Sequence, residues 1–369
     1  MSRLFYRTAS IVASAVVLTA SLSQADPTYD TILNVNDSAT GVRGTDTTNT
    51  GNVILTGSQQ TGGVTQGLLW SGNLYSNIGT YYTILPQVAG TLSSSIYYGP
   101  DTHAFNSLIP EGEIRAVGTY QLEGETGTYG FLYQGALQNG TYAVTAINVQ
   151  GAVNTIPHST AGNIVVGAYD NGSPTTGNSF IFDLTNGSFK SLTLGNESSL
   201  YGVWYAGNGK YVVVGGARNP GAADANQAFI ANYDLATNTI SDKTFYTFND
   251  QGGIISHFEG ITAVDGGYNV IATVTNTGDG SAIGAALAFI SVTDGVFNPN
   301  AAWTAIDVAG SDLTTGNTVY ENVGIGVYAD SGSANVNTYT AVVPEPSTYA
   351  LVALGLGALL LGLKRRATA

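Results

Sequence analysis

Short apolar stretches separated by polar turn residues recur along most of this chain. In the first kind of stretch, an apolar segment ends at a small residue that is often followed by tyrosine. It occurs at residues 54–57, 116–120, 165–169, 213–215, 271–273 and 324–328. The copies are about 50 residues apart, which is typical of repeated units of several strands. The many Gly, Tyr, Thr and Val residues favour strands and turns over helices.

Two further kinds of stretch follow in the same order within each repeat. An aromatic-bearing strand is predicted at residues 68–70, 131–133, 180–182, 228–230, 288–290 and 338–340. A third strand is predicted at residues 82–85, 146–149, 192–194, 245–248 and 305–308. The sixth repeat has no third strand of its own, and residues 31–35 resemble the missing one. Because the body begins with the kind of strand that its last repeat lacks, we predict a ring in which the first strand completes the last repeat. Such a ring has no exposed sheet edges.

Hairpin signals separate the predicted strands. They are Asn139-Gly140, Asn171-Gly172, Asn186-Gly187, Asn208-Gly209, Asp265-Gly266 and Asp294-Gly295. Asn and Asp tolerate the positive φ that tight hairpins need, and Gly adopts it freely. Three or four short strands in each repeat predict an all-β fold, a β-propeller of six blades. Five or seven blades, or a pair of β-sandwiches, remain alternatives. The repeats also weakly resemble bacterial extracellular propeller-like repeats, and this resemblance implies only the fold.

The two ends of the chain have a different pattern. Residues 1–25 combine Arg3 and Arg7, an apolar stretch at 9–20 and small residues before Ala25, which is the layout of a cleaved signal peptide. Near the other end, residues 348–363 are uncharged and end at Lys364, Arg365 and Arg366. As a helix they would span ~24 Å, short for a bilayer but sufficient with snorkelling basic residues. The basic residues predict a cytoplasmic end.

Pro344, Glu345 and Pro346 stand directly before this apolar stretch. This tripeptide, followed by a short transmembrane helix and a basic end, resembles the PEP-CTERM sorting signal of Gram-negative bacteria. The resemblance implies an exosortase that reads the tripeptide and removes the tail, and it implies association with exopolysaccharide. Three regions follow: a signal peptide at 1–25, an exported body at 26–343 and a sorting signal at 344–369. The expected partners are signal peptidase, exosortase, the inner membrane in passing and, as a candidate, exopolysaccharide.

The body is strongly acidic. The chain has 11 Lys and Arg against 25 Asp and Glu. Since five of the basic residues and one of the acids lie in the two ends, the body has a net charge of about −18. Such a surface repels nucleic acids and anionic lipids. The chain has no cysteine, which excludes thiol nucleophiles, Cys-bound zinc and iron–sulfur clusters.

Few side chains suggest chemistry. His103, His158 and His257 fall in different repeats without metal-ligand spacing, so we interpret them as turn or surface residues. His257-Phe258-Glu259 has the His-x-Glu letters of zinc deaminases, but these enzymes also need cysteines that are absent here. We predict no catalytic residue and no cofactor. Loops at 169–172 and 277–280 could offer oxygen atoms to calcium, although hairpin turns explain them more simply.

Four glutamates and three tryptophans are further candidates for carbohydrate chemistry or binding. Glu111, Glu113, Glu123 and Glu125 are predicted to gather across one hairpin, where paired carboxylates could hydrolyse glycosides. Solvated positions along a strand are the simpler interpretation. Aromatic rings can stack on sugars, but Trp70, Trp204 and Trp303 fall at predicted core positions.

No nucleophile elbow, Walker loop or dinucleotide motif is present. The sequence therefore predicts a non-enzymatic protein directed to the cell surface or extracellular matrix, with a structural or interaction role. A polysaccharide-binding module is the alternative, and a propeller glycosidase or lyase is a third hypothesis.

Overall fold

The computed structural model describes residues 26–137, 142–172, 177–192, 194, 197–218, 226–250 and 253–344. Asp26–Val343 form one compact unit. Several predicted features lie outside the described residues: the signal peptide with Ala25, the motif residues Glu345 and Pro346, the helix at 348–363, the basic residues Lys364, Arg365 and Arg366, and the Asn139-Gly140 turn. The part of the chain that is described holds no helix long and apolar enough to cross a membrane.

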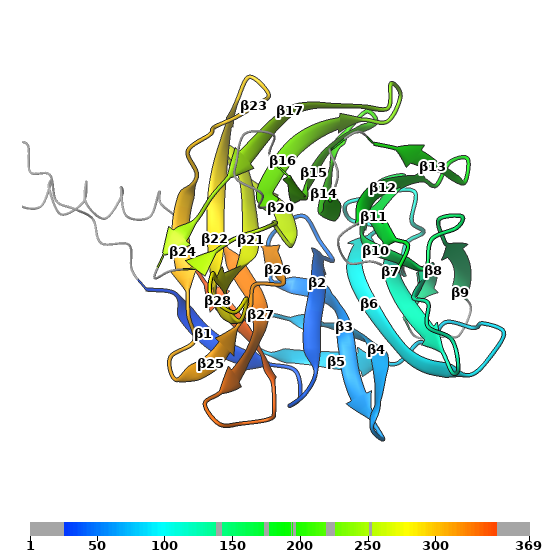
Figure 1. Cartoon of the computed structure of the whole chain (residues 1–369), viewed down its shortest axis with the longest axis horizontal. Helices are drawn as coiled ribbons and strands as arrows, with labels where there is room; N and C mark the ends of the chain where they lie inside the picture. The colour runs from blue at the N-terminus through cyan, green and yellow to red at the C-terminus, as the bar shows by residue number, and fades with distance from the viewer. Residues whose placement is uncertain are drawn as a thin grey trace, which may run out of the picture. The chain divides into compact units, whose positions relative to one another are not determined.

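The described residues form six antiparallel sheets arranged as the blades of a β-propeller (Figure 1). Blade 1 contains β2 (Ser38–Gly44), β3 (Asn52–Thr61), β4 (Val64–Asn73) and β5 (Ile78–Tyr82), and blade 2 contains β6 (Leu92–Thr102), β7 (Glu113–Leu122), β8 (Tyr129–Ala136) and β9 (Tyr142–Ile147). Blade 3 contains β10 (Asn154–Ala161), β11 (Ile164–Asp170), β12 (Asn178–Asp183) and β13 (Ser188–Ser191). Blade 4 contains β14 (Ser199–Gly207), β15 (Lys210–Arg218), β16 (Asn226–Asp234) and β17 (Thr239–Tyr246). The expected all-β propeller with six blades is confirmed.

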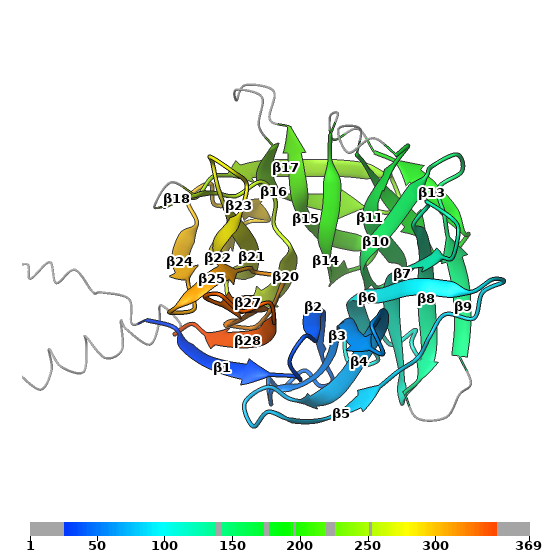
Figure 2. The same cartoon turned by 60° about the horizontal axis from the view of Figure 1, so that its bottom comes forward.

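The last two blades have the same plan with interruptions. Blade 5 contains β18 (Asn249–Asp250), β19 (Gly253–Ile254), β20 (Gly260–Val264), β21 (Gly267–Asn276), β22 (Ala282–Thr293), β23 (Val296–Phe297) and β24 (Ala302–Ile306). Blade 6 contains β25 (Ser311–Thr314), β26 (Thr318–Tyr320), β27 (Val323–Asp330), β28 (Asn337–Val342) and, from the other end of the body, β1 (Thr28–Ile32). The inner strands β2, β6, β10, β14 and β20 surround the centre of the ring (Figure 2).

The ring is closed by its first strand, as the sequence predicts. β1 pairs with β28, with Thr28 opposite Val342 and Ile32 opposite Thr338, and Figure 2 shows the two strands side by side. The strand expected at 31–35 begins and ends about three residues earlier, because Leu33 turns into the left-handed region at φ 64°. β28 is thereby bonded on both sides, to β27 and to β1.

The predicted strands fall in three of the four positions of each blade. The first kind is always the second strand and the aromatic kind is always the third. The third kind marks only the end of the outer strand or the residues beyond it; residues 192–194 follow β13 rather than form it. Most inner strands were missed, because their sequences are mixed and polar, as in Ser38–Gly44 and Asn154–Ala161.

The repeated glycine of the second strand has a steric cause. A Cβ added to this glycine would lie 1.8–2.5 Å from a carbonyl oxygen of the inner strand. The pairs are Gly57 with Ser38, Gly118 with Ile96, Gly167 with Ile156, Gly215 with Ser199 and Gly326 with Thr315. In blade 5 the equivalent residue is Ala272, and there the inner strand is interrupted over residues 255–259. Backbone contact with the inner strand therefore requires glycine at this position.

Apolar side chains of neighbouring blades pack against each other. Val214 of blade 4 and Val270 of blade 5 belong to one buried cluster, and Val166 of blade 3 and Phe229 of blade 4 belong to another. Each fully buried side chain of this size contributes roughly 1.5–3 kcal/mol. Since each cluster joins two blades, the hydrophobic effect holds the ring together around its circumference.

We predict that Gly215→Ala destabilises the body by at least about 2 kcal/mol, because the new Cβ would lie 2.0 Å from the carbonyl oxygen of Ser199. The midpoint of thermal unfolding, followed by circular dichroism, measures the effect. The control is Gly177→Ala, since no described atom lies within 4 Å of its added Cβ. Equal midpoints for the two variants would refute the steric role of the repeated glycine.

Candidate functional site

In four blades the residue at one shared structural position of the inner strand lines a cavity near the axis. Just beyond the contact with the repeated glycine, the pairing register shifts by one residue in blades 1 to 4, which is a β-bulge. A bulge re-aims the side chain of its extra residue and is frequent beside functional sites. The residues at this position are Thr40, Tyr98, His158, Tyr201, Glu259 and Asn317, one from each blade.

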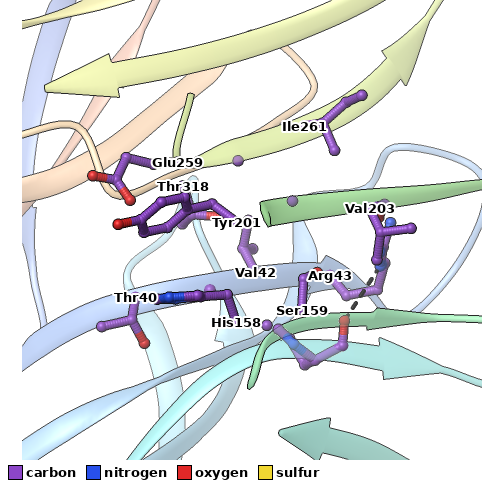
Figure 3. A pocket seen from close by; sticks show the side chains of 15 residues that line it. Thr40, Val42, Arg43, His158, Ser159, Tyr201, Val203, Glu259, Ile261 and Thr318 are labelled. Atoms are coloured by element: carbon purple, nitrogen blue, oxygen red, sulfur yellow. Dashed lines mark hydrogen bonds between the residues drawn. The ribbon is translucent and has the colours of Figure 1, made fainter. Parts of the chain in front are cut away.

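The residue after the bulge is small in every blade and closes the channel. These residues are Gly41, Gly99, Ser159, Gly202, Gly260 and Thr318. A Cβ added to Gly41 would lie 2.7 Å from the Cα of Gly99, and one added to Gly99 would lie 2.9 Å from the Cα of Ser159. The cavity that they leave has a volume of about 20 Å³ (Figure 3). That space holds one or two water molecules.

Two of the three histidines, His158 and His257, lie in a stack of rings at this channel. The expectation of a turn or surface residue is wrong for His158, which lies in β10, whereas His257 lies in the non-strand residues 255–259 with its side chain 25% exposed. The ring centres of His158 and Tyr201 are 4.2 Å apart, and those of Tyr201 and His257 are also 4.2 Å apart. Tyr98 meets the other side of His158 edge-on at 5.2 Å. His103 is exposed in the turn after β6, as expected. The separate repeats hid this stack, because only ring closure brings the blades together.

His257 links two polar side chains beside this stack. Its Nδ1 lies 2.8 Å from Ser256 Oγ and its Nε2 lies 2.7 Å from Glu259 Oε1. Burial alone would lower the pKa of His257, but the charge of Glu259 and the hydrogen bond to it outweigh burial and raise this pKa. A hydroxyl, an imidazole and a carboxylate in sequence are the parts of a nucleophilic triad. Of these three residues, Glu259 lines the small cavity at the axis, whereas Ser256 and His257 are not among its lining residues.

His158 has the opposite behaviour. Burial, together with the positive charge of His257, lowers the pKa of His158 to about 3. Its ring is therefore neutral at all ordinary pH values and packs between Tyr98 and Tyr201. Burial also raises the pKa of Tyr201 to about 12, so that its hydroxyl remains protonated.

A buried polar network fills the other end of the channel. The Arg43 guanidinium lies over Trp204 at 4.7 Å and Phe105 at 5.7 Å, and its Nε is 3.8 Å from Asp101 Oδ1. Asp101 Oδ2 accepts hydrogen bonds from Asn106 Nδ2 at 2.9 Å and from the backbone of Gly162 at 3.2 Å. The adjoining free volume is about 10 Å³. Arg43 thus closes this end.

Arg115 ties the same network to blade 3. Its Nη1 donates to the Gly162 carbonyl at 2.7 Å, and its Nε and Nη2 both donate to Gln134 Oε1. The side chains of Arg43 and Asp101 are only 7% and 1% exposed. No sequence motif marks these three charged residues. Their rarity could have indicated a specific role, since the body has only six Lys and Arg residues in all.

The glutamates of the proposed glycosidase pair do not gather. Glu111 and Glu113 lie at the start of β7, whereas Glu123 and Glu125 follow its end, about 30 Å away along an extended strand. The prediction that they cluster across one hairpin is wrong, because β7 itself separates them. Among the side chains that line the axial cavity, Glu259 is the only carboxylate. A standard glycosidase needs two.

The calcium loops and the tryptophans have structural roles. Asp170 Oδ1 accepts the Gly172 N–H at 2.6 Å, and Asp279 Oδ1 accepts the Ser281 N–H at 2.9 Å, so turn hydrogen bonds use these oxygens. The described residues contain no group of three or more metal-ligating side chains. Trp70 is 2% exposed in the core, and Trp204 and Trp303 pack partly buried against another core cluster.

Comparison with known proteins identifies the segment after the ring. The family model described as the PEP-CTERM protein-sorting motif matches residues 342–366. The motif confirms the expected sorting signal, and it implies that the protein is exported, membrane-anchored through this segment and processed by an exosortase. No curated protein matches the chain.

Solved structures of propellers are distantly similar. Bacillus subtilis arabinanase Arb43A is 8% identical, with 87% of this chain and 97% of the arabinanase covered and a TM-score of 0.42. The endosialidase of phage phi92 is 9% identical, with 87% and 70% covered and a TM-score of 0.46. The WD40 β-propeller domain of Doa1 is 12% identical, with 88% and 99% covered and a TM-score of 0.41.

We predict that the body loses stability as the pH falls from 7 toward 4, and that His158→Phe reduces this loss. Unfolded His158 takes up a proton near pH 6.5, whereas the folded residue does so only near pH 3. Acid therefore favours unfolding by up to about 1.4 kcal/mol per pH unit in this window. His257, whose pKa is raised, contributes with the opposite sign, stabilising below pH 6.5 and losing this effect as the pH rises.

Urea unfolding at several pH values measures the difference between wild type and His158→Phe. The control is His103→Phe, which removes an exposed histidine from the turn after β6. Identical pH dependence in wild type and His158→Phe would contradict the assigned burial of the neutral ring. NMR titration of the imidazole signals gives the pKa of His158 directly.

Proposed function

We propose that this chain is a non-enzymatic, surface- or matrix-directed protein of an exopolysaccharide-producing Gram-negative bacterium. In this proposal the exported ring has a structural or interaction role, and the PEP-CTERM segment delivers it. The observation that carries the proposal is the match to the sorting motif at 342–366, which begins where β28 completes the closed ring. The acidic body is compatible with a hydrated matrix, because its net charge favours solubility.

The filled axis supports a role without catalysis. Small-molecule sites usually offer about 300–1,000 Å³. The two cavities along the axis measure only about 20 and 10 Å³, and the protein's own side chains occupy the rest. A sugar could enter only if the inner strands moved apart, and their backbones are in direct contact at Gly41, Gly99 and Ser159. A ring of this kind is suited to presenting its outer surface.

The sorting role predicts that Glu345→Gln lowers the amount of processed protein about tenfold, corresponding to ~1.4 kcal/mol in recognition by the processing enzyme. Deleting residues 348–363 should instead release the protein from the membrane, because no apolar anchor remains. Cell fractionation and the intact mass of the protein in its native host measure both effects. Glu111→Gln is the control, since Glu111 is an exposed acid of the body. Normal processing of Glu345→Gln would overturn the assignment.

The absence of catalysis has its own test at Ser256. A fluorophosphonate probe reacts with serines that an adjacent base activates. Since the proposed role is non-enzymatic, we expect no labelling of Ser256, although its Oγ lies 2.8 Å from His257 Nδ1. Mass spectrometry of the treated protein detects the adduct. Labelling that disappears in Ser256→Ala, and that weakens in Glu259→Gln, would instead indicate a hydrolase.

A further inference from the structure

The topology fixes the face of the ring from which the sorting segment leaves. Neighbouring strands of a blade are antiparallel, so the first and third strands of every blade run toward the same face. β28 is the third strand of blade 6, and it ends on this face at Val342. The turn before β27 lies there too: Asn322 accepts the Val343 N–H at 2.9 Å and donates its Nδ2 to the Val343 carbonyl at 2.7 Å. We name this side the exit face.

Exposed apolar side chains are concentrated on the exit face. Nine large hydrophobic residues of the described chain are exposed. Those at the exit-face ends of their strands or in its loops are Tyr29 (40%), Tyr75 (52%), Ile78 (72%), Leu108 (59%), Tyr205 (36%) and Val296 (57%). The other three, Val35, Val64 and Val153, lie in loops or strand ends of the opposite face. The internal segments 138–141, 173–176, 193, 195–196, 219–225 and 251–252, which are not described, contain no large apolar residue in their sequence.

The kinds of residue on the exit face fit the boundary between water and lipid. Tyrosine is enriched at membrane interfaces, because its ring is apolar and its hydroxyl is polar. Three of the six residues are tyrosines, and Ile78 and Leu108 are the most exposed of the set. Exposed acids such as Glu111 and Asp294 share this face. They oppose anionic headgroups and leave zwitterionic ones as the compatible surface.

The length of the connection brings the exit face close to the bilayer. Only residues 344–347 separate Val343 from the apolar stretch that starts at Thr348. Even fully extended, this connection spans at most about 18 Å. A short tether gives a weakly binding surface a high effective concentration at its target. Scattered apolar contacts, too weak to recruit a free protein, are sufficient for a tethered one.

We propose that the exit face rests on a zwitterionic membrane surface while the sorting segment is uncleaved, with Leu108, Ile78 and the exit-face tyrosines in the headgroup region. This inference rests on the proposed function, because it requires the tail to be inserted in a bilayer. Removal of the tail then releases the ring and exposes the same side chains to the matrix. The surface therefore has a lipid partner before processing and is free after it.

The absence of cysteine in the chain makes a direct test simple. Leu108→Cys and Val35→Cys give single labelling sites of nearly equal exposure, 59% and 57%, on opposite faces. Each full-length variant is labelled with an environment-sensitive fluorophore and placed in phosphatidylcholine nanodiscs. We expect a blue-shifted emission at Leu108 and at least threefold stronger quenching there than at Val35 by a quencher attached to the lipid headgroup region. Equal quenching at both sites would overturn the proposal.

A second variant separates tethering from affinity. About thirty Gly and Ser residues inserted between Val343 and Pro344 lower the effective concentration, so quenching at Leu108 should fall toward the Val35 value. Unchanged quenching would show that the tether is not the cause and would contradict the proposal. Protection of the Leu108 label by soluble dextran, with no quenching from lipid, would assign the surface to a neutral glycan instead.

The same samples test the proposed function separately. If the full-length protein does not associate with the nanodiscs, the tail does not anchor it, and both the proposed function and the docking proposal fail. If it associates but the Leu108 label remains in water, only the docking proposal fails.

Discussion

The contact between one glycine and one carbonyl group in five of the six blades determines the architecture around the axis. Because the second strand has no Cβ at Gly57, Gly118, Gly167, Gly215 and Gly326, the inner strand approaches within 1.8–2.5 Å of the place a Cβ would occupy. The inner strand then bulges, so the next side chain turns toward the axis and the small residue after it closes the channel. Blade 5 has Ala272 at this position, and its inner strand is interrupted over residues 255–259; in blade 6 the inner strand is also interrupted, over residues 315–317 beside Gly326. The missing Cβ of the repeated glycine thus accounts both for the bulge residue beside the axis and for the small residue that closes the channel.

The sequence predicted the second and third strands, the number of blades and the closure by β1, because apolar residues and glycine recur at a regular period there. It did not predict most inner strands. These strands line the axis and are not packed between two apolar layers, so their sequences are mixed and polar. Nor did it predict that His158, Tyr201 and His257 would stack, since these residues are 43 and 56 positions apart in the chain. Such contacts arise only when the ring closes, and no local pattern encodes them.

The charged residues show the same limit. Arg43 of blade 1, Asp101 and Arg115 of blade 2 and the Gly162 backbone of blade 3 form a single network. Removing one partner from such a network leaves an uncompensated buried charge, which is strongly destabilising. In a body with so few basic residues, two arginines are therefore committed to joining the first three blades. Their burial favours a fixed ring over one that opens to admit a ligand.

The sorting segment begins on one particular face of this fixed ring. β28 is held between β27 and β1, and Val343 is held by Asn322, so the folded body extends to the residue before Pro344. The chain therefore leaves the ring at one fixed place, on the face where β28 ends. The exposed side chains of Leu108, Ile78 and three tyrosines lie on the face where the chain leaves the ring. On a ring tethered at that face, the same distribution matches the surface that lies opposite.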